Sequence, residues 1–137
     1  EQLLPAEVMH RLALEECRGF LDRLAADSVY VDFRSRRALD EKERWLSGER
    51  SLGELTIARD KAARVRDDVI ELGDERATTG AQAVCHALSA DPSHAFRNVV
   101  YKVLAIYDTP DEVARVKDLV RRRLREHGAR AAAPFTT

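Results

Sequence analysis

Apolar residues recur at helical spacing along nearly the whole chain, whereas the alternation typical of strands is almost absent. From Pro5 onward they repeat every three or four residues, which predicts a helix of about five turns with one buried face. That face comprises Met9, Ala13, Cys17, Phe20 and Leu24. The segment DSVYVDF, residues 27–33, favours a strand, but a lone strand leaves its backbone groups without partners. We therefore interpret it as an extended linker.

Helix-capping residues predict two further helices. The second covers residues 35–46 and ends at Gly48, a favoured C-terminal cap; its inward-facing residues are Ala38, Leu39, Trp45 and Leu46. Ser51 and Glu54 have the spacing of a capping box and open the third helix. Its apolar positions form a narrow seam that ends before Gly73, namely Leu55, Ala58, Ala62, Val65, Val69 and Leu72. The alanines of this seam allow another helix to approach closely.

Three more helices complete the pattern. The fourth ends near Asp91 and Pro92, where proline disfavours continuation, and its apolar positions are Ala77, Ala81, Val84 and Leu88. The fifth starts at or just after Pro92, and its wide apolar face indicates a central helix: Phe96, Val99, Val100, Val103, Leu104 and Tyr107. The sixth opens with the capping sequence Thr109, Pro110 and Glu112 and ends before Gly128; its apolar positions are Val113, Val116, Val120 and Leu124. The pattern predicts an all-α fold, a single-domain bundle of about six helices, up-down or orthogonal, over residues 1–128, with a flexible tail over residues 129–137.

Composition narrows the function classes. The chain has 137 residues, which fits one domain, and its 23 basic and 24 acidic residues give a net charge of -1. The protein as a whole therefore has no strong positive electrostatic field to attract nucleic acid or an anionic membrane. The sequence contains no run of eighteen apolar residues, so it predicts no membrane-spanning helix. The two cysteines, Cys17 and Cys85, form no disulfide framework, so a reducing compartment is indicated. We expect a soluble, cytoplasmic protein without a cofactor.

The stretch AVCHALSADPSHAF, residues 83–96, is the strongest candidate for a metal or catalytic site. Adjacent helical residues point about 100° apart, so Cys85 and His86 do not easily share one ion. His86 and His94 straddle a turn and can converge, with a third ligand from another helix, such as His10 or a carboxylate. The alternative is that the histidines pack or form hydrogen bonds between helices, and we expect this structural role.

Two charged segments are candidate binding surfaces. An acidic cluster at the end of the third helix, where the helix dipole disfavours negative charge, is a predicted docking surface: Asp67, Asp68, Glu71, Asp74 and Glu75. The run RRRLRE, residues 121–126, could meet phosphate or an acidic partner, but Leu124 interrupts it as a core residue and acidic residues flank it. We do not expect nucleic-acid binding. We find no glycine-rich phosphate loop, no nucleophile elbow and no Ser/His/Asp arrangement, and we assign no catalytic residue.

Three segments together resemble a bacterial family of immunity proteins, small helical domains of polymorphic toxin systems. The first is DFRSRRALDEKERWLSGERSLGELTIARDKAA, the second is AVCHALSADPSHAFRNVVYKVLAI, and the third is the closing amphipathic helix after Pro110. The match spans about residues 32–126. The positions that match are Asp32, Arg34, Ala38, Leu39, Trp45, Gly48, Glu49, Ala58, Ala62, Ala63, His86, His94, Ala95, Tyr101 and Ala105.

The resemblance implies an all-α protein without enzymatic activity that binds and neutralises a cognate toxin made by the same cell. It also implies that His86 and His94 face each other across the turn at Asp91 and Pro92. Our first hypothesis is an immunity-type protein whose acidic cluster faces a basic toxin surface, for example that of a nuclease. The alternatives are a small metal-dependent enzyme that uses His86, His94 and a carboxylate, or a helical adaptor that forms homo-oligomers through the third-helix seam.

Overall fold

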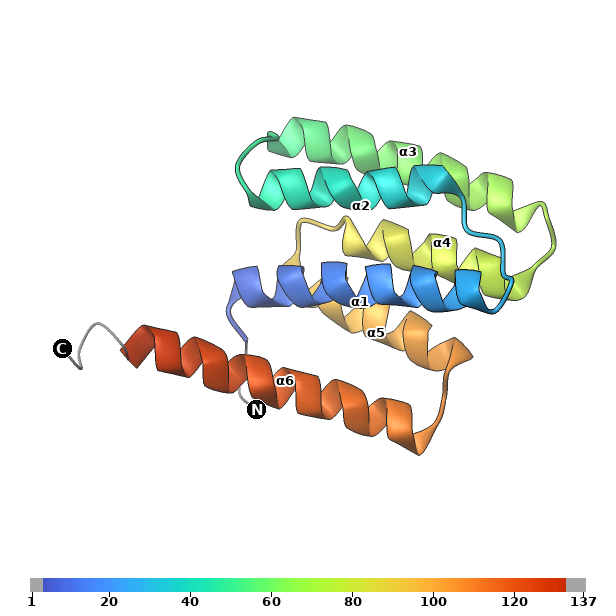
Figure 1. The fold of residues 1–137 in the computed structure, drawn as a ribbon. Coiled ribbons are helices and arrows are strands. Elements are labelled where there is room, and N and C mark those ends of the chain that lie inside the picture. The colour runs from blue at the N-terminus through green and yellow to red at the C-terminus, as the bar shows by residue number, and fades with distance from the viewer. Residues whose placement is uncertain (1–3, 133–137) are drawn as a thin grey trace.

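Helices joined by short turns make up residues 4–132, the part of the chain that the computed structural model describes. The described residues contain six helices: α1 (Ala6–Ala26), α2 (Phe33–Leu46), α3 (Leu52–Ile70), α4 (Glu75–Ala87), α5 (Pro92–Ile106) and α6 (Pro110–Ala132) (Figure 1). The predicted all-α bundle of about six helices is confirmed. Residues 28–32 form the predicted non-helical linker, and Phe33 already belongs to α2.

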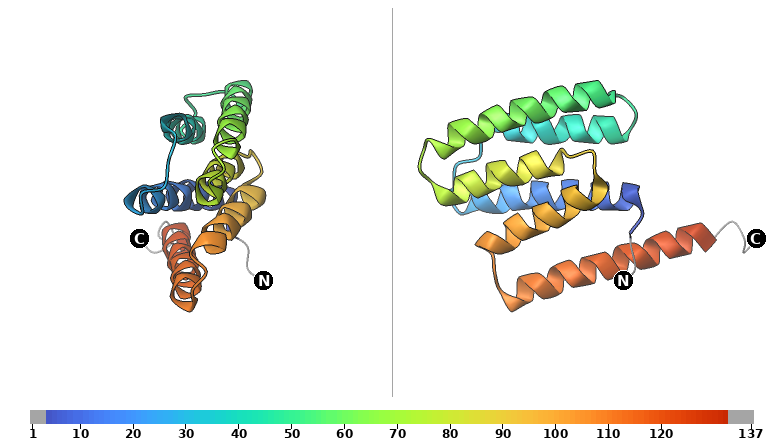
Figure 2. Two further views of the ribbon diagram at one scale, coloured as in Figure 1. Left: turned by 90° about the vertical axis from the view of Figure 1, so that its right-hand side faces the viewer. Right: turned by 180° about the vertical axis from the view of Figure 1, so that it is seen from behind.

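The helices stack in layers and alternate in direction. The antiparallel pair α2 and α3 forms one end, α1 and α4 lie in the middle, and α5 and α6 follow, an order that the views from the side and from behind repeat (Figure 2). Of the two arrangements considered, the chain adopts the up-down one. Among the described helices, α4 contacts α1, α2, α3 and α5, and α5 is contacted by α1, α4 and α6. Helix α5 is therefore packed on more than one side, as its wide apolar face predicted.

The core lies between α1, α4 and α5 and contains the apolar stripes expected from the sequence. Cys17, Phe20 and Leu24 of α1 are buried, as are Val84 of α4 and Val99 of α5. The helices α1 and α4 approach closely at Gly80, since a Cβ atom there would lie 2.8 Å from the Leu24 Cδ1 atom. The absence of a side chain at this position is what allows the contact.

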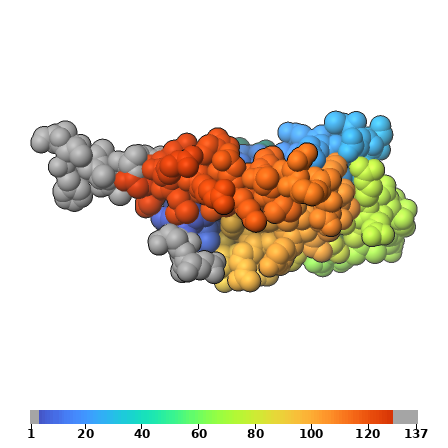
Figure 3. Space-filling view, turned by 90° about the horizontal axis from the view of Figure 1, so that it is seen from below, coloured from blue at the N-terminus to red at the C-terminus, as the bar shows by residue number. Residues whose placement is uncertain are grey.

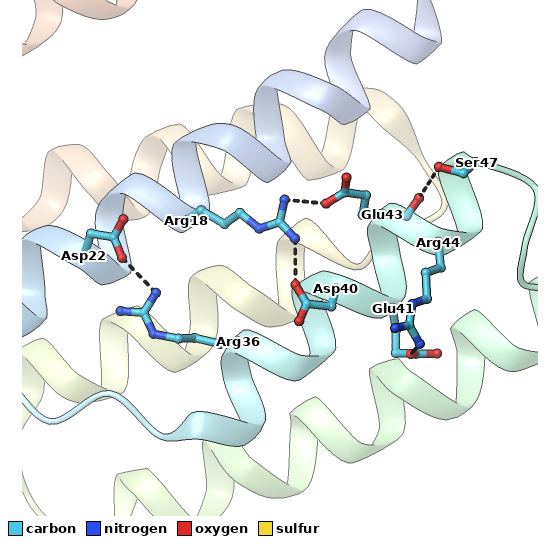
Figure 4. Close-up of polar contacts among 8 residues, drawn as sticks. All are labelled: Arg18, Asp22, Arg36, Asp40, Glu41, Glu43, Arg44 and Ser47. Carbon is cyan, nitrogen blue, oxygen red and sulfur yellow. Dashed lines mark hydrogen bonds and ion pairs between the residues drawn. The ribbon is translucent and has the colours of Figure 1, made fainter.

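Ion pairs join α1 to α2 on the solvent side of the core. Arg18 of α1 binds Asp40 at 2.8 Å and Glu43 at 2.6 Å, and Arg36 of α2 donates to Asp22 at 2.8 Å (Figure 4). These pairs are exposed, so each contributes about 1 kcal/mol or less to stability. Their role is to orient α2 on α1.

The predicted helix boundaries follow local capping chemistry. The Ser51 Oγ atom accepts from the Glu54 backbone at 3.1 Å and the Glu54 carboxylate accepts from the Ser51 backbone at 2.9 Å, which is the expected capping box. Gly48 and Gly73 adopt φ angles of 82° and 74°, in the left-handed region that favours glycine, and both lie just after helices. Asp91 caps α5, with Pro92 in its first turn.

Two boundary predictions are wrong. Leu72 was placed in the buried seam of α3, but α3 ends at Ile70, and Leu72 lies 60% exposed in the turn that follows. The last helix was expected to stop before Gly128, yet α6 continues to Ala132 because the alanines that follow Gly128 favour the helix. Of the predicted flexible tail, residues 129–132 are therefore helical, and residues 133–137 lie outside the described residues.

Helix α6 lies across the underside of the bundle (Figure 3). Its apolar contact is small: Leu119 packs with Leu4 and Leu12, and Leu124 is half-buried beside them. Ion pairs add to this contact, because Arg115 binds Glu16 of α1 at 2.7 Å. Among residues 4–132, no helix combines the length and the apolar character that a membrane span requires.

Candidate functional site: the acidic end of the bundle

The predicted acidic cluster divides between two helices. Asp67 and Asp68 lie in the last turn of α3, and Glu71 is its C-cap. Asp74, by contrast, is the N-cap of α4: its carboxylate accepts from the backbone N–H groups of Arg76 at 3.0 Å and Ala77 at 3.1 Å. Glu75 follows in the first turn of α4.

The expectation that all five carboxylates lie at the end of the third helix is therefore wrong. Asp74 and Glu75 lie at a helix N-terminus, where negative charge is favourable and an Asp cap stabilises the helix by about 1 kcal/mol. The sign of the helix dipole at Asp74 and Glu75 is reversed because α3 ends at Ile70 and Asp74 begins α4 after the turn that contains Gly73. Asp67, Asp68 and Glu71 remain at an unfavourable helix end.

These three carboxylates are exposed and weakly partnered. Asp68 accepts from Arg34 at 3.1 Å, and Asp67 forms only a long 3.4 Å contact with the neighbouring Arg66. Glu71 has no hydrogen bond or ion pair from its side chain to any described residue. Much of their charge is therefore presented to solvent.

Arg34 connects the start of α2 to the end of α3. Its guanidinium group binds Asp32 at 2.8 and 3.0 Å as well as Asp68 at 3.1 Å. Asp32 is buried and caps α2 through the Arg34 backbone, and the Arg34 side chain lowers the pKa of this carboxyl group to about 2. The motif residues Asp32 and Arg34 thus hold two helix ends together.

Exposed apolar side chains surround the same helix ends. Tyr30, Phe33 and Leu72 are 51%, 63% and 60% exposed. Tyr30 donates to Asp32 at 3.0 Å, Phe33 precedes Arg34, and Leu72 follows Asp68 by about one helical turn. The sequence pattern did not indicate this patch, because Leu72 fitted the buried seam and the DSVYVDF segment was considered only as a linker. We use "acidic end" below for Tyr30, Phe33, Asp67, Asp68, Glu71 and Leu72.

A buried lysine is the polar group that the sequence analysis missed. Lys42 of α2 has no exposed surface, and its Nζ atom donates to the carbonyl oxygens of Ala87 at 2.8 Å and Ser89 at 2.6 Å. The Nζ atom also lies 5.1 Å from the centre of the Trp45 ring. Burial lowers the pKa of Lys42 to about 7.

His10 of α1 packs beside this lysine. Its ring meets the Trp45 ring edge-on at 5.2 Å, and its Nδ1 atom is buried without a hydrogen-bond partner among the described residues. Burial, followed by the charge of Lys42, lowers the pKa of His10 to about 4. His10 is therefore neutral at pH 7. Trp45 packs against both His10 and Lys42, which gives it a structural role.

His86 and His94 meet as expected. The His86 Nδ1 atom lies 3.2 Å from the His94 Nε2 atom, across the turn that contains Asp91 and Pro92. Burial, followed by the neighbouring His94, lowers the pKa of His86. Of the third ligands considered for a metal site, His10 is not beside them, because it packs on Trp45. Over residues 4–132 no three His, Cys, Asp or Glu side chains are close enough together to hold a metal ion.

The remaining predicted positions are dispersed. Gly48 ends α2, Glu49 is exposed in the turn after it, and Tyr101 is exposed on α5. In the RRRLRE run, Arg123 binds Glu15 of α1 at 2.6 Å and Arg122 binds Asp118 at 3.4 Å, so the run is partly neutralised.

The third-helix seam considered for oligomerisation is not on the surface. Leu55, Ala58, Ala62, Val65 and Val69 are buried within the chain itself. Helix α3 packs on α2 and α4. A homo-oligomer would therefore need another surface.

Comparisons with protein-family models, with curated proteins and with solved structures gave no match.

Proposed function

We propose that the protein is a non-enzymatic helical binding protein that neutralises a cognate toxin by holding a basic surface of that toxin against the acidic end. The observation that supports this proposal most directly is the grouping of three exposed apolar side chains with three exposed carboxylates at one end of the bundle. Each class of side chain has a distinct part in the proposed binding.

Tyr30, Phe33 and Leu72 supply the anchors. Aromatic side chains bury a large area at a low conformational-entropy cost, and a few such residues usually carry most of an interface's binding energy. Their grouping matters because a single exposed apolar residue is ordinary, whereas several together form a surface that gains free energy when it is covered.

The carboxylates supply attraction and orientation. Asp67, Asp68 and Glu71 are exposed, so they interact with a basic partner at long range and accelerate association, most strongly at low salt. Rapid association suits an inhibitor that acts as soon as the toxin appears. Arg34, which is itself exposed, joins α2 to α3 beside these carboxylates, which limits the entropy lost on binding.

The test combines capture with a functional readout. The tagged chain is used to isolate partners from a lysate of its source organism, and each stoichiometric partner is expressed alone and together with the chain. We expect a partner that arrests growth alone and is tolerated in the presence of this protein. A partner that leaves growth unaffected when expressed alone would contradict neutralisation.

Charge reversal then tests the surface. The variant Asp67→Lys, Asp68→Lys, Glu71→Lys should slow association with the partner by at least about tenfold at low salt. The matched control Glu49→Lys, Asp108→Lys, Asp111→Lys changes the same charge at exposed positions elsewhere and should slow it by about twofold or less. Equal rates for both triple variants would exclude the acidic end.

A second variant tests the apolar anchors. Phe33→Ala with Leu72→Ala removes exposed side chains, so the fold should persist while dissociation of the complex accelerates by at least about tenfold. Tyr101→Ala, which removes an equally exposed aromatic ring from α5, is the control. Unchanged dissociation in the double variant would contradict a role for the apolar side chains.

A further inference from the structure

A second surface of a different character lies between α2 and α3. A groove of about 630 Å³ runs between these helices, lined by side chains that recur every three or four residues on both of them. The buried residues among its lining, which form its floor, are the small or apolar Ala38, Ala58 and Val65. Small side chains at these positions allow the backbone of another chain to approach the helices closely.

One half of the groove is cationic and is not neutralised from within the protein. Arg37, Lys61 and Arg64 line it, all three are exposed, and none forms an ion pair with another described residue. Arg37 instead lies over the Phe33 ring, with 5.4 Å from its Cζ atom to the ring centre. Lys61 and Arg64 are three residues apart on one helix, so their charges repel each other.

The other half of the groove carries both signs of charge. Glu41 and Glu54 lie there beside Arg44, and Glu41 binds both Arg44 at 3.3 Å and Arg50 at 2.9 Å. The Glu54 carboxylate is held by the Ser51 backbone. The groove therefore changes from a cationic half to a largely neutralised half along its length.

We propose that the groove between α2 and α3 binds an acidic segment of a partner protein, with the carboxylates of that segment at Arg37, Lys61 and Arg64. Charge complementarity selects this occupant, because three unneutralised cations around an apolar floor match a peptide that carries carboxylates along one side. Between Arg34 and Arg44 the groove follows α2 for about 15 Å, which accommodates about five residues of extended chain.

A nucleic acid fits the groove less well. Its phosphates would continue past the cationic half into the largely neutralised half, where the lining cation Arg44 already binds Glu41. A protein segment can place its carboxylates in one half only and present polar or apolar residues to the other. None of the three cations belongs to the acidic end, and the two surfaces meet where Arg37 lies over the Phe33 ring.

The probe is a fluorescently labelled glutamate peptide of about five residues, and binding to the full chain is measured by fluorescence anisotropy at low salt. The groove variant is Arg37→Gln, Lys61→Gln, Arg64→Gln, and the matched control is Arg97→Gln, Lys117→Gln, Arg121→Gln, which removes the same charge from exposed positions on α5 and α6. Arg34 is left unchanged because it also binds Asp32 and Asp68.

We expect the wild-type chain to bind the glutamate peptide, the groove variant to bind it at least about tenfold more weakly, and the control to remain within about twofold. The far-ultraviolet circular dichroism and the melting temperature of the groove variant should match those of the wild type, because all three side chains are exposed. The proposal is overturned if the wild-type chain does not bind the peptide, if both triple variants lose affinity equally, or if a thymidine oligonucleotide of similar length binds more tightly. All three outcomes leave the acidic end and its proposed function untouched.

Discussion

The Nζ atom of Lys42 lies 2.8 Å from the carbonyl oxygen of Ala87, at the C-terminal end of α4, where it has no exposure to solvent. The last carbonyl groups of a helix have no partner within the helix, and their partial negative charge attracts a cation. A lysine from α2 thus completes the end of α4 and joins the two helices inside the bundle. The same burial disfavours the charged form of its amine.

Replacing Lys42 tests how much its two hydrogen bonds contribute to stability. Lys42→Met leaves two buried carbonyl groups without a donor, so we expect a loss of about 2 kcal/mol in the free energy of unfolding at pH 7. Chemical denaturation measures this, with the exposed Lys61→Met as the control. A variant as stable as the wild type would show that the two hydrogen bonds contribute nothing net.

The pH dependence of the same variant gives an independent readout. The pKa of Lys42 falls to about 7 in the folded protein from 10.5 in a free side chain, so the unfolded state binds more protons between these values. Stability therefore rises as the pH increases from about 7 toward about 10. Lys42→Met should lack this rise, whereas Lys61→Met should retain it. Parallel profiles for Lys42→Met and the wild type would contradict the lowered pKa.

Acid should destabilise the protein through His10. Its pKa is about 4 when folded and 6.5 in a free side chain, so below pH 6.5 the unfolded state binds a proton that the folded state does not. Stability falls as the pH decreases from about 6.5 to about 4, by at most about 3 kcal/mol. His10→Phe should flatten that part of the profile, and the exposed His127→Phe should not. Identical slopes for all three proteins would reject this assignment.

The ion pair between Glu16 and Arg115 should contribute to the docking of α6 on α1. The two bonds are 3.0 and 2.7 Å long and the Glu16 side chain is only 9% exposed, so we expect a coupling energy of about 1 to 2 kcal/mol in a double-mutant cycle with glutamine at both positions. The exposed pair of Arg122 and Asp118 should give less than about 0.5 kcal/mol. Equal coupling in the two cycles would show that burial of Glu16 has no effect.

Two glycines in helices should respond in opposite directions. Gly19 of α1 is exposed, and a Cβ atom added there would have no neighbouring atom within 4 Å, so Gly19→Ala should stabilise the protein by about 0.5 to 1 kcal/mol. At Gly80 a Cβ atom would lie 2.8 Å from buried Leu24, so Gly80→Val should destabilise it by about 2 kcal/mol or more. Thermal unfolding of both variants measures the difference, and a stabilising Gly80→Val would contradict the close packing of α1 and α4.

Capping chemistry made most helix boundaries predictable. Ser51 and Glu54 bond to each other's backbone across one turn, and Gly48 and Gly73 adopt conformations that glycine tolerates best, so three or four neighbouring residues decide where these helices begin and end. The end of α6 was predicted less well because the alanines after Gly128 outweigh one glycine. The pairing of His86 with His94 was also foreseen, since a short turn joins their helices.

The candidate surfaces depended on contacts between distant segments. Lys42 looks like a solvent-facing residue of α2 until the end of α4 supplies its two carbonyl partners, 45 and 47 positions away. Leu72 matches the apolar spacing of α3 but is exposed, because the helix ends before it. Helical periodicity shows which residues share a face of a helix. Burial and charge pairing also depend on which other helix covers that face, and the packing of the whole chain decides which helix does so.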